Sequence, residues 1–318
     1  MLTVLIASRN GAKTLPEVLE SFCALEQPKG DWKLVIVDNN SSDQTKKVVS
    51  AFFSRLPLVY LFEPTIGKNP ALNRGLSEAE GDLVVFTDDD SVPRQDWLVR
   101  MRAMCDTNPG FDIFAGRVIP RWEKTPPDWI LNWVPLGCTF TVSNPRLVEG
   151  PIGPQYVFGP NMAVRKSFFD RGHRFSVKIG PRGKSYAMGS EAEFVQRLFR
   201  AGSRCWFSPD TIVEHLIDER HLNKSWVFRR AVLFGRGCMR LDFSDNPWTY
   251  ESWPRLRRDL VRQVGEFTWD SISSAVIGNP EALFRNRWEL SFWYGQLVEA
   301  YKLGRESARS RRTGDTSK

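Results

Sequence analysis

Short apolar runs alternate with an amphipathic stretch at the start of the chain. Four runs rich in Val, Leu, Ile and Phe, each bounded by polar or turn residues, predict buried strands at residues 2–7, 33–37, 58–62 and 83–87. Between the first two runs, apolar residues recur at intervals of three and four, which predicts an amphipathic helix from Leu15 to Leu25. This alternation favours the α/β class, with a mostly parallel sheet covered by helices on both faces.

The pattern is less regular in the middle of the chain. After a further predicted strand at residues 112–119, residues 120–155 contain seven prolines and three tryptophans without a clear period. We therefore predict a long loop or an irregular insertion there. Residues 190–201 have the spacing of a helix, and Gly202 is placed to end it.

Residues 220–318 differ from the rest in composition. The 44 Lys and Arg outnumber the 37 Asp and Glu, and the whole excess of +7 lies in this last third, together with half of the 12 tryptophans. Three helices are predicted between about residues 223 and 303, separated at Asn246-Pro247 and at Gly278-Asn279-Pro280. The polar tail from Ser307 to Lys318 is predicted to be disordered. These features place a domain boundary near residue 219.

Composition also excludes several classes of protein. With 42 % apolar and 25 % charged residues, the 318-residue chain is neither disordered, collagenous nor a coiled coil. The five cysteines lie far apart without a C-x-x-C pair, so we expect reduced thiols and neither a disulfide framework nor a thiolate zinc site. The N-terminus has no basic leader and no stretch approaches 18 apolar residues, so we expect a cytoplasmic protein without a spanning helix.

Polar residues directly follow three of the predicted strands. Ser8, Arg9 and Asn10 end the first strand, Asp38 ends the second, and the run Asp88-Asp89-Asp90 ends the fourth. In an open parallel sheet, ligands collect at the carboxyl ends of the strands. We therefore expect a ligand site where these side chains meet.

The three adjacent aspartates would repel one another unless a cation or ligand neutralised them. Mg²⁺ or Mn²⁺ prefers such oxygen ligands and commonly adds phosphate oxygens of a substrate, which would suit a nucleotide diphosphate. The alternative is a solvated acidic turn before the helix that follows Pro93. Asp38 has a similar pair of interpretations, because it either binds a nucleotide base or ribose, or belongs to a turn and helix cap.

The familiar glycine-rich phosphate loops are missing from the sequence. Neither G-x-x-x-x-G-K-[ST] nor G-x-G-x-x-G occurs, and the first strand ends in Ser-Arg-Asn-Gly instead. This argues against a kinase, a P-loop ATPase and an NAD enzyme. A bound nucleotide would be held by side chains and a metal.

Five motifs in order resemble the family 2 inverting nucleotide-sugar glycosyltransferases, whose catalytic domain has the GT-A fold. They are LTVLIASRN, VIVDNNSSDQT, GKNPALNRGLSEAEGDLVVFTDDD, FGPNMAVRK, and GSEAEFVQRLFRAG followed by VEHL, within residues 1 to 217. The resemblance implies a GT-A domain at 1–219, with a nucleotide-sugar half at about 1–118 and an acceptor half at about 119–219. Residues 220–318 would form a basic, Trp-rich helical extension.

The resemblance also implies roles for the nucleotide half. Ser8, Arg9 and Asn10 would line the nucleotide pocket, Asp38 would contact the uracil, and Gly67 and Asn73 would form part of the wall around the base. Asp88 and Asp89 would face the ribose and the sugar, and Asp90 would bind the metal. The family's Ala-Arg-Asn is Ala71-Leu72-Asn73 in this chain, so its arginine contact is absent. Lys68 or Arg74 would have to supply that charge.

Two further positions carry implied chemistry. Glu191, in Gly189-Ser190-Glu191-Ala192-Glu193, stands where the family has the aspartate that serves as general base, and its similar basicity suits the same proton transfer. The alternative is that Glu191 and Glu193 are only first-turn acids after a Ser190 cap. His215 matches a histidine that completes the metal shell in several GT-A enzymes, or else is a hydrogen-bonded structural residue.

The acceptor side is less defined. Asn161 and Met162 lie in the segment Gly159 to Ala163, which resembles the family's acceptor-side strand. Trp122, with Trp129 and Trp133, could stack on sugar rings or could instead pin its loop to the core.

The sequence thus predicts a metal-dependent, inverting, hexosyltransferase-type enzyme that moves sugar from a UDP-sugar to a saccharide or lipid-linked acceptor in polysaccharide or glycoconjugate biosynthesis. One alternative is a sugar nucleotidyltransferase. Another is a non-catalytic basic protein that binds nucleic acid or an anionic membrane surface, because arginines after residue 228 alternate with Trp, Phe and Leu. No nucleic-acid-binding signature occurs, so we expect no nucleic-acid partner, and the C-terminal helices are candidates for peripheral contact with the inner face of the cell membrane.

Overall fold

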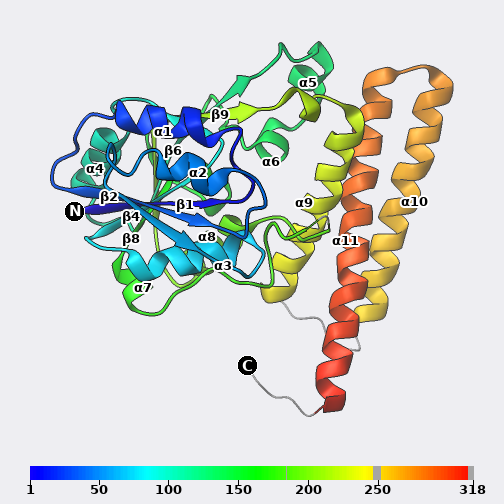
Figure 1. Ribbon diagram of the computed structural model, residues 1–318. Coiled ribbons are helices and arrows are strands. Elements are labelled where there is room, and N and C mark those ends of the chain that lie inside the picture. Colours follow the sequence, from blue (N-terminus) through cyan, green and yellow to red (C-terminus); the bar gives the residue numbers. More distant parts are fainter. Residues whose placement is uncertain (184, 246–251, 314–318) are drawn as a thin grey trace. The chain divides into compact units, whose positions relative to one another are not determined.

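A computed structural model describes residues 1–183, 185–245 and 252–313 (Figure 1). The chain forms two compact units. The sheet unit comprises residues 1–124, 136–183 and 190–219, and the helical unit comprises the segments 125–135, 184–189 and 220–318. The segments 125–135 and 184–189 belong to the helical unit although they precede residue 219. The composition of the sequence does not reveal this.

The first half of the sheet unit is parallel, as predicted. Its strands are β1 (Leu2–Ser8), β2 (Trp32–Asp38), β3 (Leu58–Phe62) and β4 (Leu83–Asp88). They are adjacent in the order β3-β2-β1-β4, with Ser8 paired to Asp38 and Ala7 to Asp88. The polar strand ends therefore lie at one edge of the sheet.

The second half of the sheet mixes directions. It contains β5 (Ser91–Pro93), β6 (Ile113–Trp122), β8 (Met162–Arg165) and β9 (Cys205–Ile217), in the order β4-β8-β6-β9-β5, while β7 (Gly150–Ile152) pairs with β9. Strand β8 is antiparallel to both β4 and β6, whereas β6 and β9 are parallel. Strand β5 is antiparallel to β9 and places Ser91 opposite His215, which brings this histidine beside the acidic turn.

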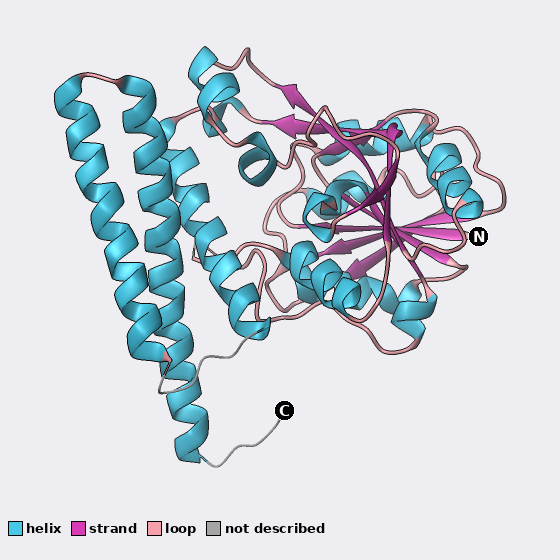
Figure 2. Ribbon diagram, turned by 180° about the vertical axis from the view of Figure 1, so that it is seen from behind, coloured by secondary structure: helices cyan, strands magenta, loops and turns pink. Residues whose placement is uncertain are grey.

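Helices cover both faces of this sheet (Figure 2). On one face, side chains such as Val4 and Ile6 pack with α1 (Leu15–Cys23), α2 (Thr45–Ser50) and α4 (Trp97–Thr107). On the other, Leu5 packs with α3 (Lys68–Gly75), the 3-10 turn η1 (Leu76–Glu78), α7 (Ser167–Asp170) and α8 (Ser190–Arg200). Alternate residues of a strand point to opposite faces, so one apolar run contributes side chains to the hydrophobic core on each side of the sheet.

The segment 120–155 is more structured than the sequence predicts. It contains α5 (Asp128–Trp133), α6 (Leu136–Phe140), β7 and the 3-10 turn η2 (Pro154–Tyr156), and η3 (Gly159–Asn161) follows before β8. The segment is therefore not a structureless loop but matches the other predicted alternative, an irregular insertion, and its elements are each too short to show a period in the sequence. Within the helical unit, the rings of Trp129 and Trp133 lie 5.4 Å and 5.8 Å from Phe284.

The helical unit contains the three helices that the sequence predicts after residue 219. They are α9 (Lys224–Asp245), α10 (Trp253–Ile277) and α11 (Pro280–Thr313), preceded by the 3-10 turn η4 (Glu219–His221). The backbone is helical to Thr313, so the prediction of disorder was wrong for residues 307–313, and residues 314–318 lie outside the described part. Over the described residues, we find no helix with both the length and the apolar character that crossing a bilayer requires.

Candidate active site

Asp89 and Asp90 form the turn that joins β4 to β5, directly after Asp88 at the end of β4. At the end of β1, the Ser8 hydroxyl donates a hydrogen bond of 2.5 Å to Asp89 Oδ2. Gly11 is close to both, because a Cβ atom at this position would lie 2.4 Å from Ser8 Oγ and 2.7 Å from Asp89 Oδ2. A side chain at residue 11 would thus displace the hydroxyl or the carboxylate.

Lys68, the first residue of α3, links the aspartate cluster to α8. Its ammonium lies 2.6 Å from Asp88 Oδ1 and 2.5 Å from Glu191 Oε1. Glu191 rests over Gly159, where a Cβ would come within 2.4 Å of its Oε1. A glycine leaves space for this close approach, so α3, η3 and α8 meet at the Glu191 carboxylate, and Lys68 connects it to Asp88 at the end of β4.

The neighbouring charges and burial shift the pKa values of Lys68 and Asp89. Burial alone would lower the pKa of Lys68, but the carboxylates of Asp88 and Glu191 outweigh burial and raise that pKa, so the ammonium stays protonated. Burial and the adjacent Asp90 charge raise the pKa of Asp89 to about 7, even though the Ser8 hydrogen bond opposes the shift. The run of acids is therefore only partly compensated by the protein itself.

Asp90 pairs with His215 of β9. The two atoms Asp90 Oδ2 and His215 Nε2 are 3.4 Å apart, and His215 Nδ1 lies 2.8 Å from the carbonyl oxygen of Phe140. Burial alone would lower the pKa of His215, but Asp90 raises it, and the same pairing lowers the pKa of Asp90 against the effect of burial. The backbone contact orients the ring so that Nε2 faces the acidic turn.

Asp90 and His215 fit a divalent ion in part. Within the described residues, no three His, Cys, Asp or Glu side chains form a cluster that could hold a metal. One carboxylate and one imidazole are nevertheless a donor pair that Mn²⁺ accepts, provided that its remaining ligands are phosphate oxygens and water.

Asp38 is buried and already bonded on both oxygens. Its Oδ1 accepts the Ser41 amide at 2.9 Å and its Oδ2 accepts the Tyr60 hydroxyl at 2.8 Å. Asn10 has a positive φ of 56° and accepts the Ser42 amide at 2.8 Å, which ties the end of β1 to the loop after β2. Arg9 is exposed beside it.

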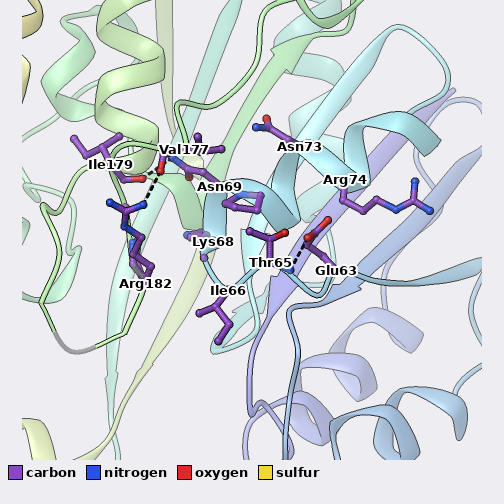
Figure 3. A pocket seen from close by; sticks show the side chains of 14 residues that line it. Glu63, Thr65, Ile66, Lys68, Asn69, Asn73, Arg74, Val177, Ile179 and Arg182 are labelled. Carbon is purple, nitrogen blue, oxygen red and sulfur yellow. Dashed lines mark hydrogen bonds between the residues drawn. The ribbon is translucent and has the colours of Figure 1, made fainter. Parts of the chain in front are cut away.

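Gly67 and Asn73 lie near a second feature, a cavity of about 510 Å³ between α3 and residues 177–182 (Figure 3). Gly67 has a φ of 146° and donates its amide to Asn39 Oδ1 at 2.7 Å. Asn73 exchanges two hydrogen bonds with the backbone of Phe175, so its side chain holds that loop.

The cationic residue at the acids is Lys68. In Figure 3, Arg74 points away from Lys68, and its guanidinium donates to Ser77 Oγ at 3.1 Å. The two lysine contacts place Lys68, and not Arg74, beside the acids.

The predicted acceptor residues separate into two groups. Asn161 and Met162 are fully buried, and Asn161 is bonded to Trp97 and to the carbonyls of Arg117 and Thr211. Neither side chain is available to a saccharide, and both belong to the framework. Trp122 is partly exposed, with its ring 5.2 Å from that of Phe140.

Four residues that shape the site were not predicted from the sequence. Tyr60 binds Asp38, Gly11 and Gly159 make room for carboxylates, and the Phe140 carbonyl orients His215. Of these, only the glycines left a signal, because each stands inside a motif at a strand end or a turn. The other two contacts join residues that are far apart in sequence.

The sheet unit has the GT-A fold. Residues 1–349 of S. aureus TarS in complex with UDP-GlcNAc superpose with a TM-score of 0.55 at 17 % identity, covering 95 % of this chain and 91 % of that one. The mannosyltransferase PcManGT from Pyrobaculum calidifontis, in complex with GDP-Man and Mn²⁺, gives 0.56 at 21 % identity, covering 97 % and 79 %.

The chain belongs to glycosyl transferase family 2, whose model matches residues 3–171. It is 24 % identical to the succinoglycan biosynthesis protein ExoM of Rhizobium meliloti, over 87 % of this chain and 84 % of that protein. It is also 24 % identical to the glycosyltransferase AglE of Haloferax volcanii, over 67 % of this chain and 66 % of that protein. The chain is therefore a glycosyltransferase.

Proposed function

We propose that this enzyme transfers a sugar from a UDP-sugar, with inversion, to a hydroxyl group of a saccharide or lipid-linked acceptor during polysaccharide or glycoconjugate biosynthesis. The observation that carries the proposal is the pair of contacts made by Lys68. Its ammonium contacts both Glu191 and Asp88, which lies at the carboxyl end of β4, where the donor is proposed to bind. A base that is this close to the donor carboxylates is placed to take the proton from an acceptor hydroxyl whose oxygen attacks the donor's sugar.

Glu191 is the proposed general base. Its carboxylate would take the proton from the acceptor hydroxyl as that oxygen attacks the anomeric carbon from the face opposite the diphosphate. A single displacement of this kind inverts the configuration. Lys68 fixes the orientation of this carboxylate through their 2.5 Å contact, and Gly159 leaves room for it.

The donor would be held by the strand ends. Asp88 and Asp89 would accept hydrogen bonds from ribose and sugar hydroxyls, and Ser8, Arg9 and Asn10 would line the nucleotide pocket. Asp38 would face the uracil in an orientation fixed by Tyr60 and Ser41, and the Gly67 turn would wall the base. Asn73 would act through the loop that contains Phe175, because its own polar atoms are bonded there.

Asp90 and His215 would hold Mn²⁺ or Mg²⁺, which when bound supplies Lewis-acid stabilisation of the departing diphosphate. The chain's own contribution is the orientation of this donor pair by the Phe140 carbonyl and by the pairing of β5 with β9. The structural neighbour PcManGT is in complex with GDP-Man and Mn²⁺, which supports the proposal of a bound metal. For the same reason, GDP-sugars are tested as donors together with UDP-sugars.

On the acceptor side, Trp122 is the remaining stacking candidate, because its ring is partly exposed. We also propose that the protein is cytoplasmic and works at the inner face of the membrane, where lipid-linked acceptors are found. The basic excess after residue 219 supports that location.

A panel of UDP- and GDP-sugars with Mn²⁺, assayed by release of the nucleoside diphosphate, tests the proposal. Glu191→Gln should still bind UDP but lose transfer, and Asp90→Asn should lose metal-dependent binding of the donor. Glu193→Gln is the matched control, because Glu193 lies in the same helical turn and pairs with Arg197 instead. Transfer at the wild-type rate by Glu191→Gln would refute the assignment of the base, and release of pyrophosphate would indicate a nucleotidyltransferase.

A further inference from the structure

The outer face of α10 exposes large apolar side chains. Within the helical unit, α11 packs against both α9 and α10, and α10 turns one face to α11 (Figure 1). The buried residues of α10, Leu260, Ser271 and Ser274, mark that inner face. The opposite face carries Val261, Trp269, Ile272 and Val276, whose exposed fractions are 51, 70, 53 and 83 %. Single exposed apolar residues are ordinary on protein surfaces, but four on one helix face are not.

Three arginines occupy the same face about two to four turns before Trp269. Arg258, Arg262, Trp269 and Val276 are separated by four, seven and seven residues, so they lie along one line of the helix. Arg255 lies close to this line, and all three arginines are exposed. The acids Asp259, Glu266 and Asp270 are rotated from the line by roughly 60 to 100°, and Glu266 lies 3.6 Å from Arg262.

We propose that this face of α10 docks on an anionic lipid surface. Trp269, Ile272 and Val276 would enter the boundary between headgroups and acyl chains, and Arg255, Arg258 and Arg262 would bind lipid phosphates beside them. Tryptophan suits this depth because its ring is apolar and its N–H is polar. The apolar part, from Val261 to Ile277, spans about 24 Å at 1.5 Å per residue, enough for an interfacial helix that does not cross the bilayer.

The distribution of charge favours lipid over a second copy of the chain. In a parallel pair of α10 helices the arginines would face one another, and in an antiparallel pair they would be buried against the apolar half of the partner helix. Both arrangements place like charges or apolar surface against the arginines and add no counterion beyond Glu266, which already lies 3.6 Å from Arg262. Lipid phosphates supply the counterions and acyl chains accept the apolar half, so a single anionic membrane satisfies both parts of the face.

This inference deepens the membrane location within the proposed function, and it does not depend on the transfer reaction. The test is flotation of the full-length protein with vesicles of phosphatidylcholine, either alone or mixed with phosphatidylglycerol. We expect binding to the mixed vesicles only, and weaker binding at high salt. Replacing two arginines, in Arg258→Gln/Arg262→Gln, should lower the bound-to-free ratio roughly thirtyfold. Trp269→Ser/Val276→Ser should lower it at least tenfold, because less apolar area is inserted.

Matched controls exist in the sheet unit. Val148 is 76 % exposed and Arg146 is also exposed, so Val148→Ser and Arg146→Gln remove the same kinds of side chain elsewhere and should leave flotation unchanged. Absence of salt-sensitive binding, or equal binding by the α10 variants and the wild type, would overturn the proposal. A dimer that Trp269→Ser/Val276→Ser dissociates, in a protein that does not float, would assign the face to self-association. Sugar transfer without flotation would leave the enzymatic assignment standing and remove this one.

Discussion

Lys68 Nζ lies 2.5 Å from Glu191 Oε1, although 123 positions separate the two residues in the chain. The same ammonium contacts Asp88, and the side chains of Lys68 and Glu191 are only 18 % and 17 % exposed. A carboxylate held in this way keeps a single orientation. This contact is the basis of the first two predictions.

Replacing Lys68 by Met should reduce transfer by roughly 100-fold or more, because Asp88 and Glu191 would then repel each other without the cation that separates them. Lys68→Arg should restore part of the rate. The measurement is kcat with saturating donor and Mn²⁺. Arg74→Met, on the same helix but bonded to Ser77, is the control and should stay near the wild-type rate. Equal loss in both variants would show that α3 is simply sensitive to substitution.

Gly159→Ala should lower kcat at least tenfold while leaving the affinity for UDP unchanged. The added Cβ would come within 2.4 Å of Glu191 Oε1, and a misplacement of about 1 Å can cost on the order of 100-fold in rate. Gly153→Ala serves as the control, because its Cβ would meet only the flexible end of Gln155. A G159A enzyme with normal kcat would mean that Glu191 is not held over residue 159 during the reaction.

Tyr60→Phe should weaken UDP binding by roughly tenfold or more, with little effect on kcat. Tyr60 donates the hydrogen bond that fixes Asp38 Oδ2, and a hydrogen bond to a charged group contributes about 1.5 kcal/mol or more. Calorimetric titration with UDP and Mn²⁺ measures the change. The surface variant Tyr156→Phe should bind as the wild type does, since that residue is 38 % exposed. Unchanged affinity in Y60F would remove Asp38 from the base site.

The stability of the helical unit should depend on pH through Glu299. This fully buried carboxylate pairs with Arg236 at 2.8 Å and with Arg240. Burial alone would raise the pKa of Glu299, but the two arginines outweigh it and lower that pKa below the ordinary value of 4.5. A lowered folded-state pKa contributes stability that is present above the unfolded pKa and is lost as the pH falls below about 4.5 through the folded pKa.

Glu299→Gln should therefore reduce the free energy of unfolding near neutral pH by about 3–5 kcal/mol, since it leaves two buried arginines without a counterion. The deficit should shrink as the pH is lowered below 4.5. Denaturant titrations at several pH values measure both effects. Glu306→Gln is the control, because Glu306 is half-exposed and 3.8 Å from Arg240, and it should change stability by less than about 1 kcal/mol. A deficit in E299Q that is independent of pH would contradict the role given to the ionised carboxylate.

The parallel half of the fold was readable because its signals are local. Each of the strands β1 to β4 contains a short apolar run and begins and ends within one residue of the prediction, although β3 is only partly buried. The short elements between residues 120 and 155 were missed because a helix of five or six residues has no measurable period. Asn161 and Met162 were assigned to the acceptor from their motif, but packing beneath the sheet buries both.

The amino-acid sequence by itself determined which polar residues stand at the carboxyl ends of β1, β2 and β4, because each apolar run is followed directly by those residues along the chain. Only the tertiary structure decided that Lys68 rather than Arg74 reaches the acids, that Asn73 binds a loop, and that α10 turns Trp269 outward. These outcomes depend on which face of each helix is covered, and that is set by contacts between segments far apart in the chain, which no local pattern contains.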